Sequence, residues 1–83
     1  MDELQTTLRE TFEANGFDVA DVSRNRDRIE VVVLTTGANA DDLRSSTYEA
    51  VPESDVLGLD IRTESVEGYD GMNTVVTFRH RPD

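Results

Sequence analysis

The sequence predicts an α+β fold, a two-layer sandwich in which a four-stranded sheet carries two helices on one face. Two segments have apolar residues at helical spacing, four have the alternation typical of strands, and their order is α-β-β-α-β-β. A chain of 83 residues is long enough for one modest hydrophobic core, so we expect a single domain over residues 1–83.

The first predicted helix covers residues 2–15. Its apolar residues recur every four positions and form one stripe: Leu4, Leu8 and Phe12. Gly16 stands where a left-handed C-terminal cap is expected, and Phe17 follows as the apolar residue that commonly packs against such a cap.

The second predicted helix starts after Asn39, a favourable N-cap, and ends before Pro52. Asp41 and Asp42 lie in its first turn, where the helix dipole favours negative charge. Its predicted buried stripe consists of Ala40, Leu43, Thr47, Ala50 and Val51.

Alternating residues predict strands over 17–23, 28–34, 56–63 and 72–80. Residues 28–34 are apolar on both faces, which favours a central position in the sheet. Polar or glycine-rich turns are expected at 24–27 and 67–71.

One topology that fits this order is a circularly permuted ferredoxin-like sandwich. In it, the last strand fills the slot that the first strand occupies in the usual βαββαβ order. The helices then cover one face of the sheet and leave the other face open.

The charge composition predicts a protein adapted to a salt-rich cytoplasm, that is, a halophilic one. The chain has 18 acidic and 8 basic residues, a formal net charge of −10, and every basic residue is arginine. Carboxylates retain water at high salt, and arginine is less strongly hydrated than lysine. At about 1 M salt the screening length is only about 3 Å, so self-repulsion is weak. In a halophile such acidity identifies no ligand. The alternative interpretation is an acidic mesophilic protein or an acidic mimic of a binding partner.

The remaining composition excludes several classes of site. The chain has no cysteine, which excludes disulfides, thiolate metal sites and a cysteine nucleophile. The N-terminus lacks the basic and apolar regions of a signal peptide, and the longest apolar run is Val31 to Leu34. We therefore expect a cytoplasmic protein that does not bind membranes.

The open face of the predicted sheet is the first candidate site. Apolar residues Val32, Leu34 and Val75 fall on it, and we expect them to bind a partner, either a second copy of the chain or another protein. Polar residues share the same face: Glu30, Asp60, Arg62, Thr77 and Arg79.

Arginine clusters form the second candidate, a patch for anions or nucleic acid. Its members come from two short segments: Arg24, Arg26, Arg28, Arg79 and Arg81. Phosphate contacts weaken steeply as salt rises, and few aromatic residues are present for base stacking. Pairing of these arginines with neighbouring acids is the alternative interpretation.

No metal, cofactor or catalytic motif stands out. Asp21, Ser23, Asn25 and Asp27 alternate as in a calcium loop, but Arg26 and Val32 occupy its glycine and glutamate positions, so we expect a hairpin. An enzyme with a site between subunits remains an alternative, with His80 the residue to test. The sequence therefore predicts a non-catalytic binding or assembly module, with a nucleic-acid accessory protein as a further alternative.

Overall fold

The computed structural model describes residues 3–34, 39–65 and 72–81, so the turn predicted at 67–71 lies outside the described residues. Its elements are helix α1 (Glu3–Ala14), strands β1 (Val19–Asn25) and β2 (Arg28–Val33), helix α2 (Ala40–Ala50), the 3₁₀ turn η1 (Glu53–Asp55), and strands β3 (Val56–Ser65) and β4 (Met72–His80). The predicted order of two helices and four strands is confirmed, and η1 is an addition to it.

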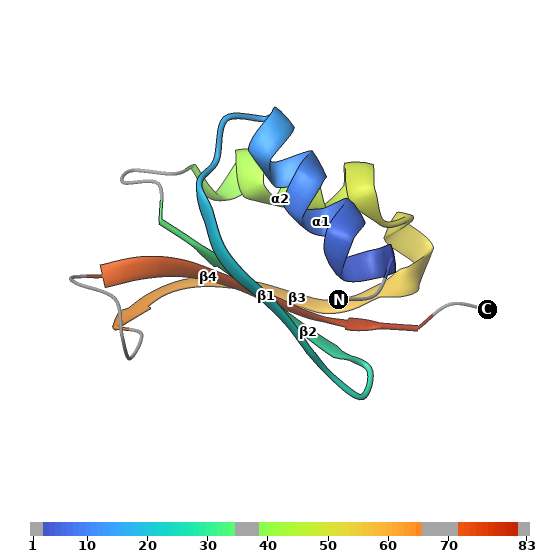
Figure 1. Cartoon of the computed structure of the whole chain (residues 1–83). Coiled ribbons are helices and arrows are strands. Elements are labelled where there is room, and N and C mark those ends of the chain that lie inside the picture. The colour runs from blue at the N-terminus through green and yellow to red at the C-terminus, as the bar shows by residue number, and fades with distance from the viewer. Residues whose placement is uncertain (1–2, 35–38, 66–71, 82–83) are drawn as a thin grey trace.

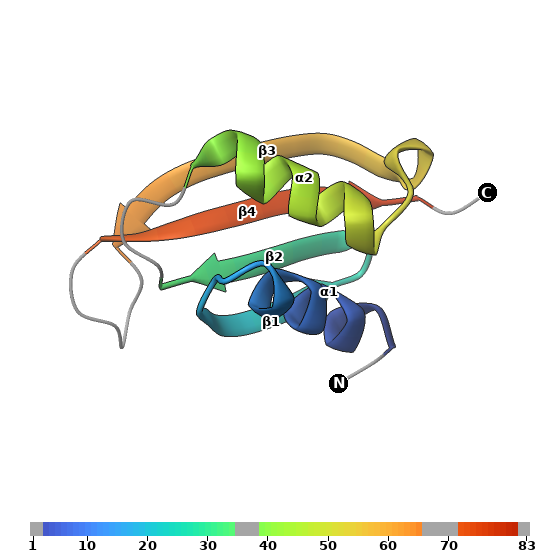
Figure 2. The same ribbon diagram turned by 90° about the horizontal axis from the view of Figure 1, so that it is seen from above.

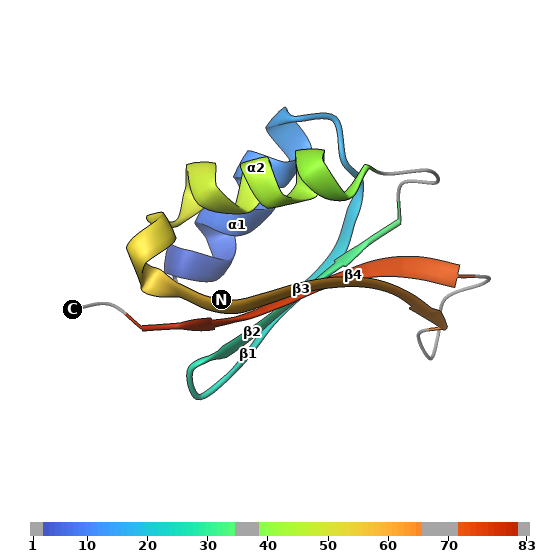
Figure 3. The ribbon, with the colours of Figure 1, turned by 180° about the vertical axis from the view of Figure 1, so that it is seen from behind.

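The four strands form one antiparallel sheet in the order β1-β2-β4-β3. The last strand, β4, lies in the interior of the sheet, in the slot that the permuted ferredoxin-like arrangement gives it. Both helices lie on the same side of the sheet (Figures 1 and 3). Seen from above, α1 runs over β1 and β2 while α2 runs over β4 and β3 (Figure 2). The predicted two-layer α+β sandwich is confirmed.

Helix α1 ends as its sequence predicts. Gly16 adopts a left-handed φ of 91°, which glycine reaches without a Cβ clash. The amides of Gly16 and Phe17 donate to the carbonyls of Glu13 and Phe12, at 3.0 Å each, which is the Schellman pattern. The Phe12 and Phe17 rings then meet with centroids 6.1 Å apart, so the cap also contributes apolar packing to the core.

Helix α2 begins at the predicted cap. The Asn39 side chain accepts a hydrogen bond from the Asp41 amide at 2.8 Å, which satisfies one of the free donors of the first turn. The buried residues of α2 are Leu43, Ser46 and Thr47. The Thr47 hydroxyl donates to the Leu43 carbonyl at 2.9 Å, so a polar side chain is accommodated against the sheet.

The hairpin between β1 and β2 is tighter than predicted. Its strands pair up to Asn25 and Arg28, so only Arg26 and Asp27 form the turn. Arg26 takes a left-handed φ of 62°, and its carbonyl accepts a hydrogen bond from Arg24 Nε at 3.0 Å. Because this local bond supports the turn, β1 extends two residues beyond the predicted boundary.

The core lies between the helices and the covered face of the sheet. It contains Leu8 and Phe12 from α1, Leu43 from α2, and the inward residues of the strands, among them Ile29, Val31, Val33, Val76 and Phe78. Each of these residues is at most 2% exposed. The apolar stripe of α1 and the strong β2 segment therefore have the burial that their periodicity predicts.

Strand β3 contains a bulge at Gly58. Between the pairs Leu57–Arg79 and Asp60–Thr77 the strand has one residue more than its partner, and Gly58 has a φ of 62°. A left-handed conformation is natural for glycine at such a bulge. The bulge places Leu57 and Asp60 on the same face of the sheet although they are three positions apart.

Replacing Gly58 with alanine is expected to lower the free energy of unfolding by about 1–2 kcal/mol, because an L residue is strained at this φ. A Cβ at Gly58 would meet no atom within 4 Å, so backbone strain is the only penalty. Gly58→Asn should lose less, since asparagine tolerates this region. Urea unfolding at high KCl measures both variants, and equal stability of Gly58→Ala and the parent would contradict a strained bulge.

Candidate open-face binding site

The face of the sheet that faces away from α1 and α2 is covered by no helix or strand of the described ranges (Figure 1). Register places its outward residues in rows that cross the strands in the order β1, β2, β4 and β3. The first row, beside the β1–β2 turn, is Asn25, Arg28, Arg79 and Leu57; the second is Ser23, Glu30, Thr77 and Asp60; the third is Asp21, Val32, Val75 and Arg62.

Both valines expected to bind a partner are already buried in the single chain. Val32 and Val75 are adjacent in the third row and only 3% and 1% exposed. Arg62 borders Val75 in this row, and the methylene stems of arginine commonly cover apolar neighbours. Val32 and Val75 therefore offer almost no apolar surface to a partner.

Leucines supply the exposed apolar surface instead. Leu34, the third residue of the predicted partner-binding set, is 41% exposed just beyond the end of β2. Leu57, which strict alternation would place on one face with Leu59 and Ile61, is instead 47% exposed in the first row beside Arg79. The bulge at Gly58 determines the face on which Leu57 lies, and a glycine inside an alternating strand is the signal that could have found it.

The two arginine clusters of the sequence meet in the sheet. Arg28 on β2 and Arg79 on β4 are direct cross-strand partners, and both are exposed. Within the described ranges, neither side chain forms a hydrogen bond or an ion pair. Like charges directly opposite one another on a sheet destabilise it, so this pair is a feature that folding alone does not explain.

The other members of the predicted arginine patch hold the local structure. Arg24 donates to the Arg26 carbonyl across the hairpin turn. Arg81 Nε lies 3.1 Å from Asp27 Oδ2, and the Arg81 amide donates to the Asp55 carbonyl at 2.8 Å. These contacts join the hairpin, the end of β4 and η1, so Arg81 pairs with an acid as the alternative interpretation expects.

A shallow hollow of about 370 Å³ lies over the first two rows and extends to Arg62 of the third, and we call it the arginine hollow. The residues that line it include Arg28, Arg79, Arg62, Asp60, Thr77 and Gly58. Asp60 is engaged by Arg62, whose Nε donates to Asp60 Oδ2 at 2.8 Å and whose Nη2 contacts the same oxygen. Three arginines and one aspartate give the lining a net formal charge of +2, on a chain of −10.

His80, the residue for the enzyme alternative, lies away from this hollow. It pairs with Val56 and alternates with Phe78, so it belongs to the helix-covered face. Its Nδ1 is buried and has no hydrogen-bond partner within the described ranges. Over the same ranges, no group of three or more histidines and acids is arranged to hold a metal ion.

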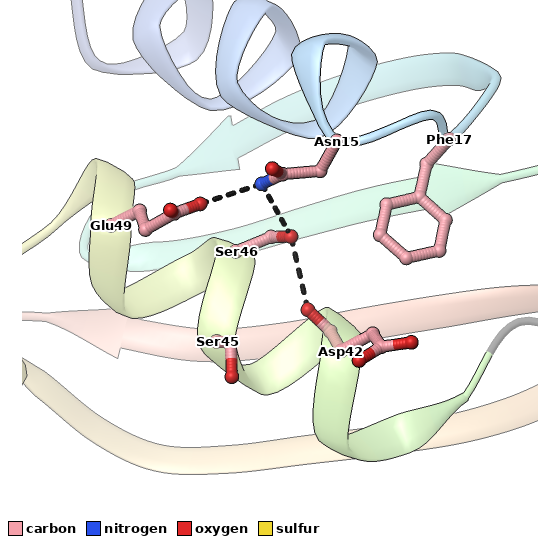
Figure 4. A pocket seen from close by; sticks show the side chains of 6 residues that line it. All are labelled: Asn15, Phe17, Asp42, Ser45, Ser46 and Glu49. Carbon is pink, nitrogen blue, oxygen red and sulfur yellow. Dashed lines mark hydrogen bonds between the residues drawn. The ribbon is translucent and has the colours of Figure 1, made fainter.

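A second cleft lies on the opposite side of the molecule, between the end of α1 and α2 (Figure 4). Asn15 Nδ2 donates to Ser46 Oγ at 2.9 Å and to Glu49 Oε2 at 2.6 Å, and the Ser46 hydroxyl donates to the Asp42 carbonyl at 3.0 Å. The polar groups at the centre of this cleft are therefore satisfied by one another. We interpret the cleft as a structural contact that holds α1 and α2 together.

Replacing Asn15 with alanine is expected to lower the free energy of unfolding by about 1–2 kcal/mol, because two hydrogen bonds between the helices are lost. Ser45→Ala is a matched control, since Ser45 is an exposed residue of the same cleft. Its effect should stay within about 0.5 kcal/mol. Thermal unfolding measures both, and equal effects would show that Asn15 does not tie the helices together.

Comparison of the sequence with protein families and with curated proteins identifies no relative. No protein-family profile matches the sequence, and no curated protein is significantly similar to it. The helices in the described part of the chain are too short or too polar to cross a bilayer.

Proposed function

We propose that the chain is a non-catalytic binding module of a salt-rich cytoplasm, acting through the open face of its sheet. The observation that carries the proposal is the cross-strand pair of Arg28 and Arg79, both exposed and without a side-chain partner in the described ranges. A sheet that retains facing arginines which form no ion pair is less stable than it could be. Proteins accept such local losses at functional surfaces.

The position of the pair also supports binding. Leu57 lies beside Arg79 in the same row and is 47% exposed, so cationic and apolar surfaces adjoin. Arginine is enriched at binding interfaces, and an exposed apolar residue beside it adds area that a partner can bury. The two helices leave this face free for a partner to approach (Figure 3).

The test compares two charge reversals in lysate kept at multimolar KCl. Arg79→Glu reverses a charge on the open face. Arg44→Glu is the control, because it makes the same charge change on α2, where Arg44 Nη1 lies 3.6 Å from Asp41 Oδ1. Each tagged chain is purified, and bound proteins, nucleic acid and small molecules are quantified. The chain has no tryptophan and two tyrosines, so bound nucleic acid is easily seen by ultraviolet absorbance.

The proposal expects material that co-purifies stoichiometrically with the parent and with Arg44→Glu, and that Arg79→Glu loses. Retention of the same material by both variants, or its loss from both, would contradict an open-face binding site.

A homodimer formed through the open face is the second candidate. The specific observation in its favour is that two leucines on or next to this face, Leu34 and Leu57, are 41% and 47% exposed. Sedimentation velocity at high salt tests it, with Leu57→Asp as the disrupting variant. A monomeric parent chain at high concentration would remove this candidate and leave the first intact.

A further inference from the structure

The arginine hollow also indicates which kind of ligand the open face takes. We propose that it binds a doubly charged phosphate group, free or carried as a phosphomonoester on a small molecule. This inference rests on the proposed function, because it names the ligand of that same surface.

Charge is the first argument. Arg28 and Arg79 are neighbours across the sheet and present two unpaired guanidinium groups to one hollow. A phosphomonoester carries a charge of about −1.5 to −2 near neutral pH and has three strong acceptor oxygens. Guanidinium groups bind such oxygens in pairs of parallel hydrogen bonds, which fix geometry as well as charge. One phosphate group can therefore engage both arginines.

The carboxylates on the same face provide the second argument. Asp60 is held by Arg62 and is thereby partly neutralised within the hollow. Glu30 is next to Arg28 along β2 on the same face, yet no ion pair forms between them. The arginine pair thus remains available beside carboxylates of the chain itself. A single carboxylate neutralises only half of the double positive charge of the arginine pair, whereas a phosphomonoester neutralises nearly all of it.

Thr77 adds a neutral hydrogen-bond donor to the lining of the hollow. Thr77 lies in the second row between Glu30 and Asp60 and is 9% exposed. Its hydroxyl is a donor, and no hydrogen bond engages it within the described ranges. Arg28 and Arg79 stand in the next row, so cationic groups and a neutral donor border one space of about 370 Å³.

A nucleic-acid backbone fits the same surface less well. Asp21, Glu30 and Asp60 share the open face and would repel the neighbouring phosphates of a polyanion. Binding of single strands usually relies on aromatic platforms. The aromatic residue that borders the hollow, Phe78, is only 2% exposed and packs in the core. The surface therefore favours one isolated phosphate group.

The test is a titration of the full chain with inorganic phosphate at constant high ionic strength, followed by NMR of the arginine Nε–H groups. The chain has eight arginines and no lysine, so these signals are few, and the Arg28→Gln and Arg79→Gln variants assign the two of interest. Arg44→Gln is the matched control on α2. Acetate, a phosphomonoester sugar and an oligonucleotide are titrated in parallel.

The proposal expects saturable shifts of the Arg28 and Arg79 signals with phosphate and with the phosphomonoester, and much weaker shifts with acetate. Loss of one charged hydrogen-bonding partner should weaken phosphate binding about tenfold or more. The Arg44→Gln chain should bind as the parent does. Tighter binding of the oligonucleotide than of the phosphomonoester would overturn the proposal in favour of nucleic acid.

Equal shifts with acetate and phosphate, or unsaturable shifts, would also overturn it. If phosphate does not bind but Arg79→Glu still loses its cellular partner, the open-face function stands and only the ligand class is wrong. If phosphate does not bind and the partner is retained, both proposals fail.

Discussion

Replacing Phe12 with alanine is expected to lower the free energy of unfolding by about 3–5 kcal/mol. Phe12 is fully buried, and its carbonyl and ring both take part in the cap that joins α1 to β1. Truncation removes apolar burial and leaves a cavity between α1 and the sheet. Domains of this size have a total stability of about 5–15 kcal/mol, so the variant should be close to unfolding.

Urea unfolding followed by far-ultraviolet circular dichroism measures the effect at constant high KCl. Leu57→Ala is the matched control, because it also removes a large apolar side chain but from an exposed position. Its effect should stay within about 0.5 kcal/mol. Similar losses in the two variants would mean that Phe12 does not lie in a packed core.

Lowering KCl from multimolar to about 0.1 M is expected to destabilise the fold by about 2 kcal/mol. The screening length grows from about 3 Å at 1 M salt to about 10 Å at 0.1 M, so like charges repel one another over longer distances at low salt. The source of the loss is repulsion within a chain of net charge −10. For a domain of this length, such a loss lowers the thermal midpoint by roughly 8–16 °C.

Glu10→Gln with Glu13→Gln provides the control for this salt effect. Both residues are exposed on α1, and their replacement reduces the negative charge without touching the core. The doubly substituted chain should lose less stability than the parent when KCl is lowered. A midpoint that stays constant or rises at low salt would contradict the halophilic interpretation of the composition.

The sequence predicts the element order and most boundaries because their signals are local. Asn39 caps α2, and Gly16 caps α1, through contacts within a few residues of chain. Alternation also separates the two faces of β2 and β4, so Ile29 and Val31 are correctly placed in the core. Three strand boundaries differ from the prediction by two residues each: the start and the end of β1, and the end of β3. The end of β1 was missed because Arg26 adopts a left-handed φ that its residue type does not indicate.

The candidate site was less predictable, because it depends on strand order and cross-strand neighbours. Proximity in the sequence groups Arg24 with Arg28 and Arg81 with Arg79. In the fold, however, Arg24 supports the hairpin turn and Arg81 pairs with the distant Asp27. Alternation places Arg62 on the open face, but only the pairing of β3 with β4 brings it to the hollow with Arg79. Burial of Val32 and Val75 likewise depends on neighbours contributed by other strands.

The central claim is that Arg28 and Arg79 together bind one phosphate group. A double-mutant cycle of these two residues, based on the free energy of unfolding without and with phosphate, tests it most directly. The cycle isolates the interaction between the two side chains from the change in net charge. Without phosphate, at the lowest KCl at which all four chains fold, the coupling should be unfavourable by about 0.2–1 kcal/mol, as expected for facing like charges. With phosphate it should become favourable, because one anion then binds both arginines. A coupling that is favourable without phosphate and unchanged by it would show that the pair stabilises the fold and binds no anion.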